Sequence, residues 1–152
     1  MFTMIGPAVA RAATIAVVIF VSATRPAVAQ AVTITPTEVT RVGGTVPFAG
    51  AAARLLAAGS ERHGDTLLSP AGRSCNTCHL EEDSYNATFK KPWPHYVASV
   101  KRKAGLDTIT AEGMVQFCMI SAMGTKPLAW DSETLAALTA FVLERHSKVV
   151  EK

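Results

Sequence analysis

A five-residue motif, Cys75-Asn76-Thr77-Cys78-His79, places two thiols and an imidazole within one turn of chain. This Cys-x-x-Cys-His spacing is the attachment signature of c-type haem. Each thiol can form a thioether with one haem vinyl group, and the adjacent histidine can then ligate the iron. The motif therefore predicts one covalently bound haem c, with Cys75 and Cys78 as attachment sites and His79 as the proximal iron ligand.

Three other chemistries use closely spaced cysteines, and each accounts for less of the motif. A disulfide redox pair is typical of a thioredoxin-like strand–helix–strand setting, which the surrounding sequence lacks. A zinc site would need further ligands, and the sequence contains no second paired motif. A structural disulfide between Cys75 and Cys78 would leave His79 without a role, so haem attachment is the favoured chemistry.

The first 29 residues predict a secretory signal peptide. Arg11 precedes an apolar run over residues 12–24, and Ala27-Val28-Ala29 fits the small-x-small pattern found before cleavage sites. The run is short for a membrane span, which makes an uncleaved anchor the less favoured interpretation. We therefore expect a mature chain from Gln30, exported to the periplasm and free of the membrane once the signal is cleaved.

Composition narrows the function classes further. The 152 residues include 49% hydrophobic and 18% charged side chains, which excludes a charged disordered tail, and three cysteines are too few for a disulfide-rich scaffold. Cleavage of the leader removes Arg11 and Arg25, which leaves 13 basic residues against 12 acidic ones. A mature charge of +1 gives no case for nucleic-acid binding.

The elements that must position the motif are helices. Residues 30–50, rich in Thr, Val, Pro and Gly, predict an extended N-terminal arm, followed by a haem domain over 51–152. The last helix is expected to be capped by Asp131 or Ser132 and to carry a stripe of apolar side chains. No strand alternation is evident. Helices are predicted over 49–58 (ended by Gly59), 61–68, 95–103, 111–123 (capped by Thr110) and from Asp131 onward.

These elements predict an all-α fold, the class I cytochrome c-like arrangement of helices around one covalently bound haem. A mature chain of about 120 residues with short helices buries modest apolar area. Because the macrocycle supplies a large apolar surface for the helices to pack on, we expect the chain without haem to fold poorly.

The second axial position of the iron has several candidates. Methionine is the usual partner of histidine in electron-transfer cytochromes c. Cys118 has a simpler interpretation as a small buried hydrophobe, but it has no partner once Cys75 and Cys78 hold haem. The candidates left open by the residues alone are Cys118, Met114, Met119, Met123 and His95.

Several segments, taken in order, resemble one family over roughly residues 60–143. Gly64-Asp65-Thr66-Leu67-Leu68-Ser69-Pro70 precedes the haem motif. After the motif come His95-Tyr96, Met114-Val115-Gln116-Phe117-Cys118, Lys126-Pro127-Leu128-Ala129-Trp130-Asp131-Ser132 and Leu135-Ala136-Ala137-Leu138-Thr139-Ala140-Phe141-Val142. The chain is similar here to the haem domain of SoxA, the haem subunit of the thiosulfate-oxidising SoxAX cytochromes.

The resemblance implies which residue ligates the iron, and it also shows one active-site position at which this chain differs from the family. In that family the cysteine at the position of Cys118 ligates the iron, which implies His79/Cys118 coordination. If a methionine is the ligand instead, Met123, in the loop before the last helix, is the first substitute. A thiolate ligand favours ferric iron, so we expect a low reduction potential. The family places an active-site arginine where this chain has Met114, and methionine cannot hold a sulfur oxyanion by charge-assisted hydrogen bonds.

Other polar and aromatic residues receive structural interpretations. His63 and His146 are expected to be exposed, and His95 to be partly exposed at a helix start. Trp93 and Trp130 are expected to pack in the haem crevice or the core, with indole N–H groups that could reach a haem propionate. One basic cluster is interpreted first as a solvated face and second as a docking patch for an acidic redox partner: Lys90, Lys91, Lys101, Arg102 and Lys103.

Three functions are compatible with these features. The leading hypothesis is a periplasmic mono-haem cytochrome that transfers single electrons to or from a redox partner protein rather than acting as an enzyme. The alternative is a catalytic or sulfur-handling subunit of a SoxAX-like complex, in which Cys118 would carry sulfur. A haem sensor that binds CO or NO is the second alternative. The resemblance also implies a heterodimer with another small cytochrome. The 30–50 arm has no assigned role and is a candidate for docking that partner.

Overall fold

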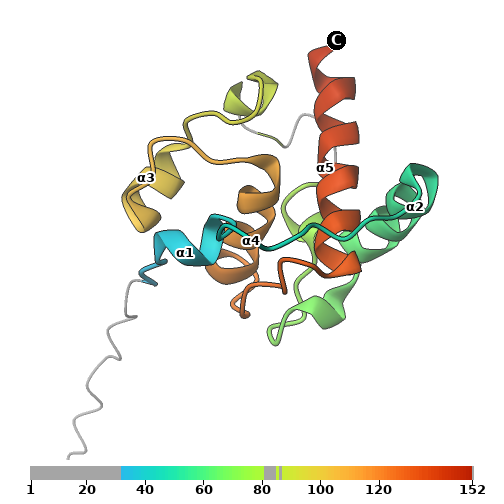
Figure 1. Cartoon of the computed structure of the whole chain (residues 1–152), viewed down its shortest axis with the longest axis horizontal. Helices are drawn as coiled ribbons and strands as arrows, with labels where there is room; N and C mark the ends of the chain where they lie inside the picture. Colours follow the sequence, from blue (N-terminus) through green and yellow to red (C-terminus); the bar gives the residue numbers. More distant parts are fainter. Residues whose placement is uncertain (1–31, 81–84, 86, 152) are drawn as a thin grey trace, which may run out of the picture. The chain divides into compact units, whose positions relative to one another are not determined.

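The computed structural model describes residues 32–80, 85 and 87–151 (Figure 1). The predicted signal segment over 1–29 lies outside these residues. The described chain contains helices and no strand, apart from one isolated antiparallel bridge between His95 and Ile109. The all-α prediction is therefore confirmed. The elements are α1 (Pro36–Val39), α2 (Ala52–His63), η1 (Thr66–Leu68), η2 (Cys75–Thr77), η4 (Ala87–Lys90), α3 (Ala98–Ala104), α4 (Ala111–Ser121) and α5 (Glu133–Val150).

The most extensive helix contact joins α2 to α5. Gly59 makes the close approach possible, because a Cβ at this position would lie 2.2 Å from the carbonyl oxygen of Ala137 and 2.8 Å from Cβ of Phe141. The sequence predicted that Gly59 ends a helix and that another covers 61–68. The structure differs: α2 runs through Gly59 to His63, and only a short 3-10 turn follows over Thr66–Leu68. The glycine serves packing between helices instead of termination.

Helices α4 and α5 begin at the residues that the sequence predicted. The Thr110 hydroxyl accepts a hydrogen bond from the backbone N–H of Gly113 at 3.0 Å. Ser132 caps α5 in the same way and accepts from the N–H of Leu135 at 3.3 Å. Because each cap satisfies an N–H group that has no partner inside its helix, it fixes where the helix starts.

Residues 32–50 contribute to the core, although composition predicted an extended arm. Ile34 and Val39 are each only 1% exposed and pack with Val100, Ala104, Ile109 and Phe117. A Cβ on Gly113 would lie 2.4 Å from the carbonyl oxygen of Val39, so the arm closely approaches α4. Helix α4 thus lies between α5 and the group formed by α1 and α3 (Figure 1).

An ion pair also fastens this segment. The Arg41 guanidinium pairs with the Glu112 carboxylate and donates a hydrogen bond to the Trp130 carbonyl at 2.8 Å.

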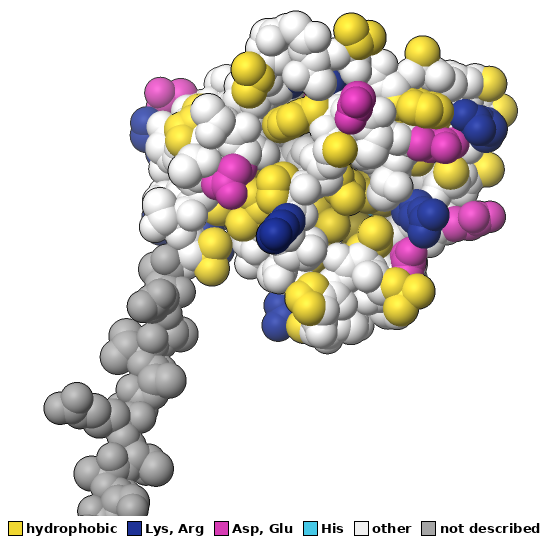
Figure 2. Space-filling view, turned by 60° about the horizontal axis from the view of Figure 1, so that its bottom comes forward, with side chains coloured by type: hydrophobic (Ala, Val, Ile, Leu, Met, Phe, Trp, Pro, Cys, Tyr) yellow, Lys and Arg dark blue, Asp and Glu magenta, His cyan; other side chains and the backbone are white. Residues whose placement is uncertain are grey.

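On one face of the molecule, hydrophobic side chains gather in a central depression with charged side chains spread around it (Figure 2). Among the described residues, no helix has the length and apolar character needed to span a membrane.

Candidate functional site

The cysteine motif forms a single tight turn after Ser74. The backbone N–H of His79 donates to the carbonyl of Cys75 at 2.9 Å, and that of Cys78 donates to the same oxygen at 3.2 Å. The Ser74 N–H donates to the Thr77 hydroxyl at 3.0 Å, which closes the turn at its start. This turn holds the two thiols and the imidazole close together on a short piece of backbone.

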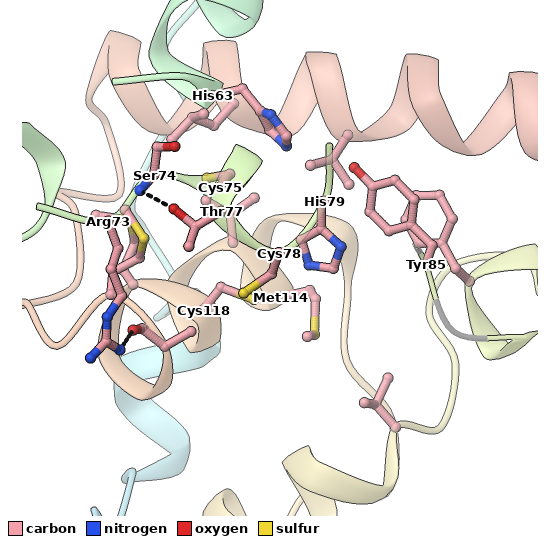
Figure 3. Close-up of a pocket in the computed structure, with 18 of the residues that line it drawn as sticks. His63, Arg73, Ser74, Cys75, Thr77, Cys78, His79, Tyr85, Met114 and Cys118 are labelled. Atoms are coloured by element: carbon pink, nitrogen blue, oxygen red, sulfur yellow. Dashed lines mark hydrogen bonds between the residues drawn. The ribbon is translucent and has the colours of Figure 1, made fainter. Parts of the chain in front are cut away.

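The motif forms one part of a large hollow (Figure 3). The hollow encloses about 990 Å³ of atom-free space, including its open mouth. Helix α4 supplies another part of the lining through residues one turn apart, Met114, Cys118 and Ala122, and α5 supplies Leu138 and Val142. Helix α4 therefore presents one face to the motif.

Every residue proposed from the sequence as an iron ligand lines this hollow. Met119 and Met123 are buried, whereas Cys118 and Met114 are partly exposed. The structure thus brings the candidates together without separating the methionines from the cysteine. The set comprises His79, His95, Met114, Cys118, Met119 and Met123.

None of the three cysteines forms a disulfide within the described residues. Burial raises the pKa of Cys118 to about 12, and the nearby Cys75 and Cys78 add to the increase. Burial also raises the pKa of Cys75. A thiol in such surroundings stays neutral until a metal replaces its proton.

His63 belongs to the site, although the sequence predicted it to be exposed. It ends α2, is only 4% exposed, and lines the hollow. Its Nδ1–H donates a hydrogen bond of 2.6 Å to Oδ1 of Asn76, inside the cysteine motif. Burial is the main cause that lowers its pKa, and the bond to Asn76 opposes this change. The helical spacing from Gly59, which faces α5, was the sequence signal that could have identified it.

Stacked rings extend from His79. The rings of His79 and Tyr85 lie 4.4 Å apart at 7°, and the rings of Tyr85 and Phe89 lie 4.1 Å apart at 13°. Burial raises the pKa of Tyr85 to about 12, so its hydroxyl stays protonated. This stack restricts how the imidazole can turn.

A second pair of rings lies in the lining. Trp93 and His95 stack with centroids 4.0 Å apart. His95 is 6% exposed, which contradicts the expectation of partial exposure at a helix start, because it precedes α3 and pairs with Ile109 instead. Trp130 does not line the hollow; it lies beneath the Arg41 guanidinium at 5.3 Å and packs against the core.

These residues fit a covalently attached haem. The motif offers two thiols and an imidazole, α4 offers sulfur donors, and the surrounding surface is largely apolar (Figure 3). Buried polar atoms of Trp93 and His95 make no hydrogen bond within the described residues. Mostly apolar linings with a few convergent polar atoms are typical of cofactor sites.

Residues 64–149 match the model of the SoxA/TsdA cytochrome c domain. The chain belongs to this family. As a member of the SoxA/TsdA cytochrome c family, it carries covalently bound haem c, as the motif predicted.

A curated relative agrees with this assignment. The L-cysteine S-thiosulfotransferase subunit SoxA of Pseudaminobacter salicylatoxidans is 28% identical over 78 residues, which cover 51% of this chain and 26% of the relative. The matched part therefore spans about a quarter of that relative's length. No solved structure matches the chain.

Proposed function

We propose that this chain is an exported mono-haem cytochrome c that transfers single electrons at low potential. In this proposal Cys75 and Cys78 attach the haem, and His79 and Cys118 ligate the iron. The observation that carries it is the position of Cys118, which lies on the face of α4 that lines the same hollow as the cysteine motif.

The choice of Cys118 over the methionines rests on burial and chemistry. Met119 and Met123 are almost fully buried, whereas Cys118 and Met114 are both partly exposed in the lining, so burial argues against the first two and chemistry must decide between the last two. Cys118 is also a third cysteine that forms no disulfide. Because thiolate donates electron density to iron more strongly than a thioether does, this ligand stabilises ferric iron.

The haem supplies the one-electron chemistry when it is bound, and the chain's residues position it. The hydrogen bond from His63 holds Asn76, and with it the turn that carries both attachment cysteines. Tyr85 stacks on His79 and orients the imidazole. Leu138 and Val142 on α5 cover the hollow with apolar surface and exclude water.

A second candidate function is a sulfur-handling subunit, because the matched relative is named as a thiosulfotransferase subunit. In this function Cys118 would carry sulfur. The lining opposes it, since Met114 offers no charge to an oxyanion. Arg73 is the one Lys or Arg side chain in the described lining; it is exposed and donates to the Ala122 carbonyl at 2.6 Å.

The proposal includes a periplasmic location and two partners, a redox protein and a small cytochrome that forms a heterodimer with this chain. The exposed Lys90 and Lys91 support docking of an acidic partner, because they lie in the sequence between Phe89 and Trp93, which both line the hollow. The matched SoxA is named as a subunit, which supports assembly with another chain.

Ferric electron paramagnetic resonance and potentiometry on the haem-loaded protein test the ligation. We expect a low-spin thiolate–imidazole signal and a negative potential. Cys118→Met should raise the potential by on the order of a few hundred mV and create the red charge-transfer band of methionine-ligated ferric haem. A positive potential with that band in the unsubstituted protein would refute thiolate ligation, and its loss in Met123→Leu would then assign Met123.

Steady-state turnover with thiosulfate separates the two functions. A carrier shows no turnover, and Cys118→Met retains haem with a shifted potential. An enzyme turns over thiosulfate and loses this activity in the same variant, which would contradict the carrier proposal.

A further inference from the structure

Besides the Tyr85 hydroxyl, two buried polar atoms in the lining have no hydrogen-bond partner within the described residues, Nε1 of Trp93 and Nδ1 of His95. Their rings stack on each other at 4.0 Å, so both atoms belong to one small region of the wall. A buried polar group without a partner destabilises the folded protein, and native proteins rarely retain one. The pair therefore implies a polar group on a bound molecule.

The chemistry of the two rings specifies this group. An indole N–H only donates hydrogen bonds, so its partner must be an acceptor. An imidazolium N–H also donates, and a carboxylate offers two oxygen acceptors in one plane. A single carboxylate can therefore satisfy both rings at once, and a haem c in this hollow provides carboxylates as its propionates.

We propose that Trp93 and His95 together bind one propionate carboxylate of the haem. The Trp93 Nε1–H donates to one oxygen, and His95 donates through Nδ1–H to the other. This assignment gives both buried atoms a partner and makes the two residues an anchor for the polar edge of the cofactor.

The backbone presents the two rings in fixed positions. The N–H of His95 donates to the carbonyl of Ile109 at 3.2 Å, and the N–H of Ile109 returns a bond to His95 at 3.0 Å. Phe89 meets the Trp93 ring edge-on at 6.1 Å. From α5, His146 Nε2–H donates to the Lys91 carbonyl at 3.0 Å, which fastens the same segment to that helix.

The charges around His95 favour an anionic ligand. Burial lowers its pKa, and Lys91 on its own segment and His146 on α5 lower it further. The backbone of Pro92 and of Lys91 raises the pKa and so opposes this change. Each side-chain charge that acts on His95 in the described residues is cationic, so a propionate would supply the missing negative charge and stabilise the imidazolium.

Binding to the haem carboxylate couples the protonation of His95 to the redox state of the haem. Addition of one electron from an external one-electron donor makes the cofactor more negative, so the pKa of His95 is higher in the reduced protein. His95 then takes one proton from water as the electron arrives. The midpoint potential should therefore fall as pH rises from the pKa of His95 in the oxidised protein to its pKa in the reduced protein. A variant that lacks His95 should not show this fall.

The test uses the haem-loaded protein with Trp93→Phe, His95→Phe and the control Trp130→Phe, whose ring is outside the lining. The unsubstituted protein should show a pH-dependent potential and a downfield, slowly exchanging Trp93 indole resonance. His95→Phe should abolish the pH dependence. Trp93→Phe, which keeps an aromatic ring, should make the potential more negative because the carboxylate loses a donor. Trp130→Phe should leave both readouts unchanged.

Two results would overturn the proposal. The first is that Trp93→Phe and His95→Phe match Trp130→Phe in potential and pH dependence. The second is a saturable shift of the Trp93 resonance on addition of sodium thiosulfate or sulfate, which would assign the pair to a soluble oxyanion. If His95→Phe fails to incorporate haem, His95→Gln replaces it, since the amide can donate but does not titrate in this range.

Discussion

Nδ1 of His63 and Oδ1 of Asn76 lie 2.6 Å apart, and this hydrogen bond joins the last residue of α2 to the interior of the cysteine motif. The His63 ring also contacts Phe141 of α5, with centroids 4.9 Å apart. The motif is therefore fastened, through one side chain, to the two helices that pack most extensively on each other.

This bond should contribute measurably to stability. Asn76→Ala leaves the buried Nδ1–H without its acceptor, and we expect a loss of about 1–3 kcal/mol in the free energy of unfolding. Denaturant unfolding of the haem-loaded protein measures the loss. A double-mutant cycle with His63→Phe supplies the control: the coupling should be about 0.5–3 kcal/mol. Strict additivity of the two substitutions would show that the bond contributes nothing.

The features that could be predicted from the sequence are those that depend on neighbouring residues in the chain. Thr110 and Ser132 cap their helices as expected, because capping depends on a side chain and the backbone next to it. The positions of Gly59, His63 and Ile34 were missed, because each depends on a helix distant in sequence. Composition cannot report such contacts, so the glycine suggested a helix end and the histidine a surface residue.

Gly59→Ala provides a test in which local and tertiary effects have opposite signs. Alanine within a helix is favoured over glycine by about 1 kcal/mol when only helix propensity acts. Here the added Cβ would lie 2.2 Å from the Ala137 carbonyl oxygen, so we expect a net destabilisation of about 1–3 kcal/mol. Gly43→Ala, with no atom within 4 Å of the new Cβ, should change stability by less than about 0.5 kcal/mol. Stabilisation by Gly59→Ala would contradict the close helix contact.

Arg41 should stabilise the packing of the segment that precedes α2. Its side chain and that of Glu112 are only 20% and 21% exposed, and the guanidinium also bonds the Trp130 carbonyl. We expect Arg41→Ala to cost about 1–3 kcal/mol in denaturant unfolding, because Glu112 and that carbonyl lose their donors. Arg54 is the matched control: it pairs with Glu133 at 58% and 45% exposure and lies over Phe48 at 5.7 Å. Arg54→Ala should cost less than about 1 kcal/mol, and equal losses in the two variants would refute the role of Arg41.

Removal of the Cys75 and Cys78 thiols should separate the roles of the three cysteines. A thioether survives denaturation and iron coordination does not, so haem staining of a denaturing gel and intact mass report attachment alone. We expect Cys75→Ser/Cys78→Ser to lose covalent haem and Cys118→Ser to retain it. The double variant should also unfold at much lower denaturant concentration, because Leu138 and Val142 would lose the apolar surface that they cover. Covalent haem in the double variant would place attachment elsewhere, whereas its loss in Cys118→Ser alone would show that Cys118 is needed for attachment.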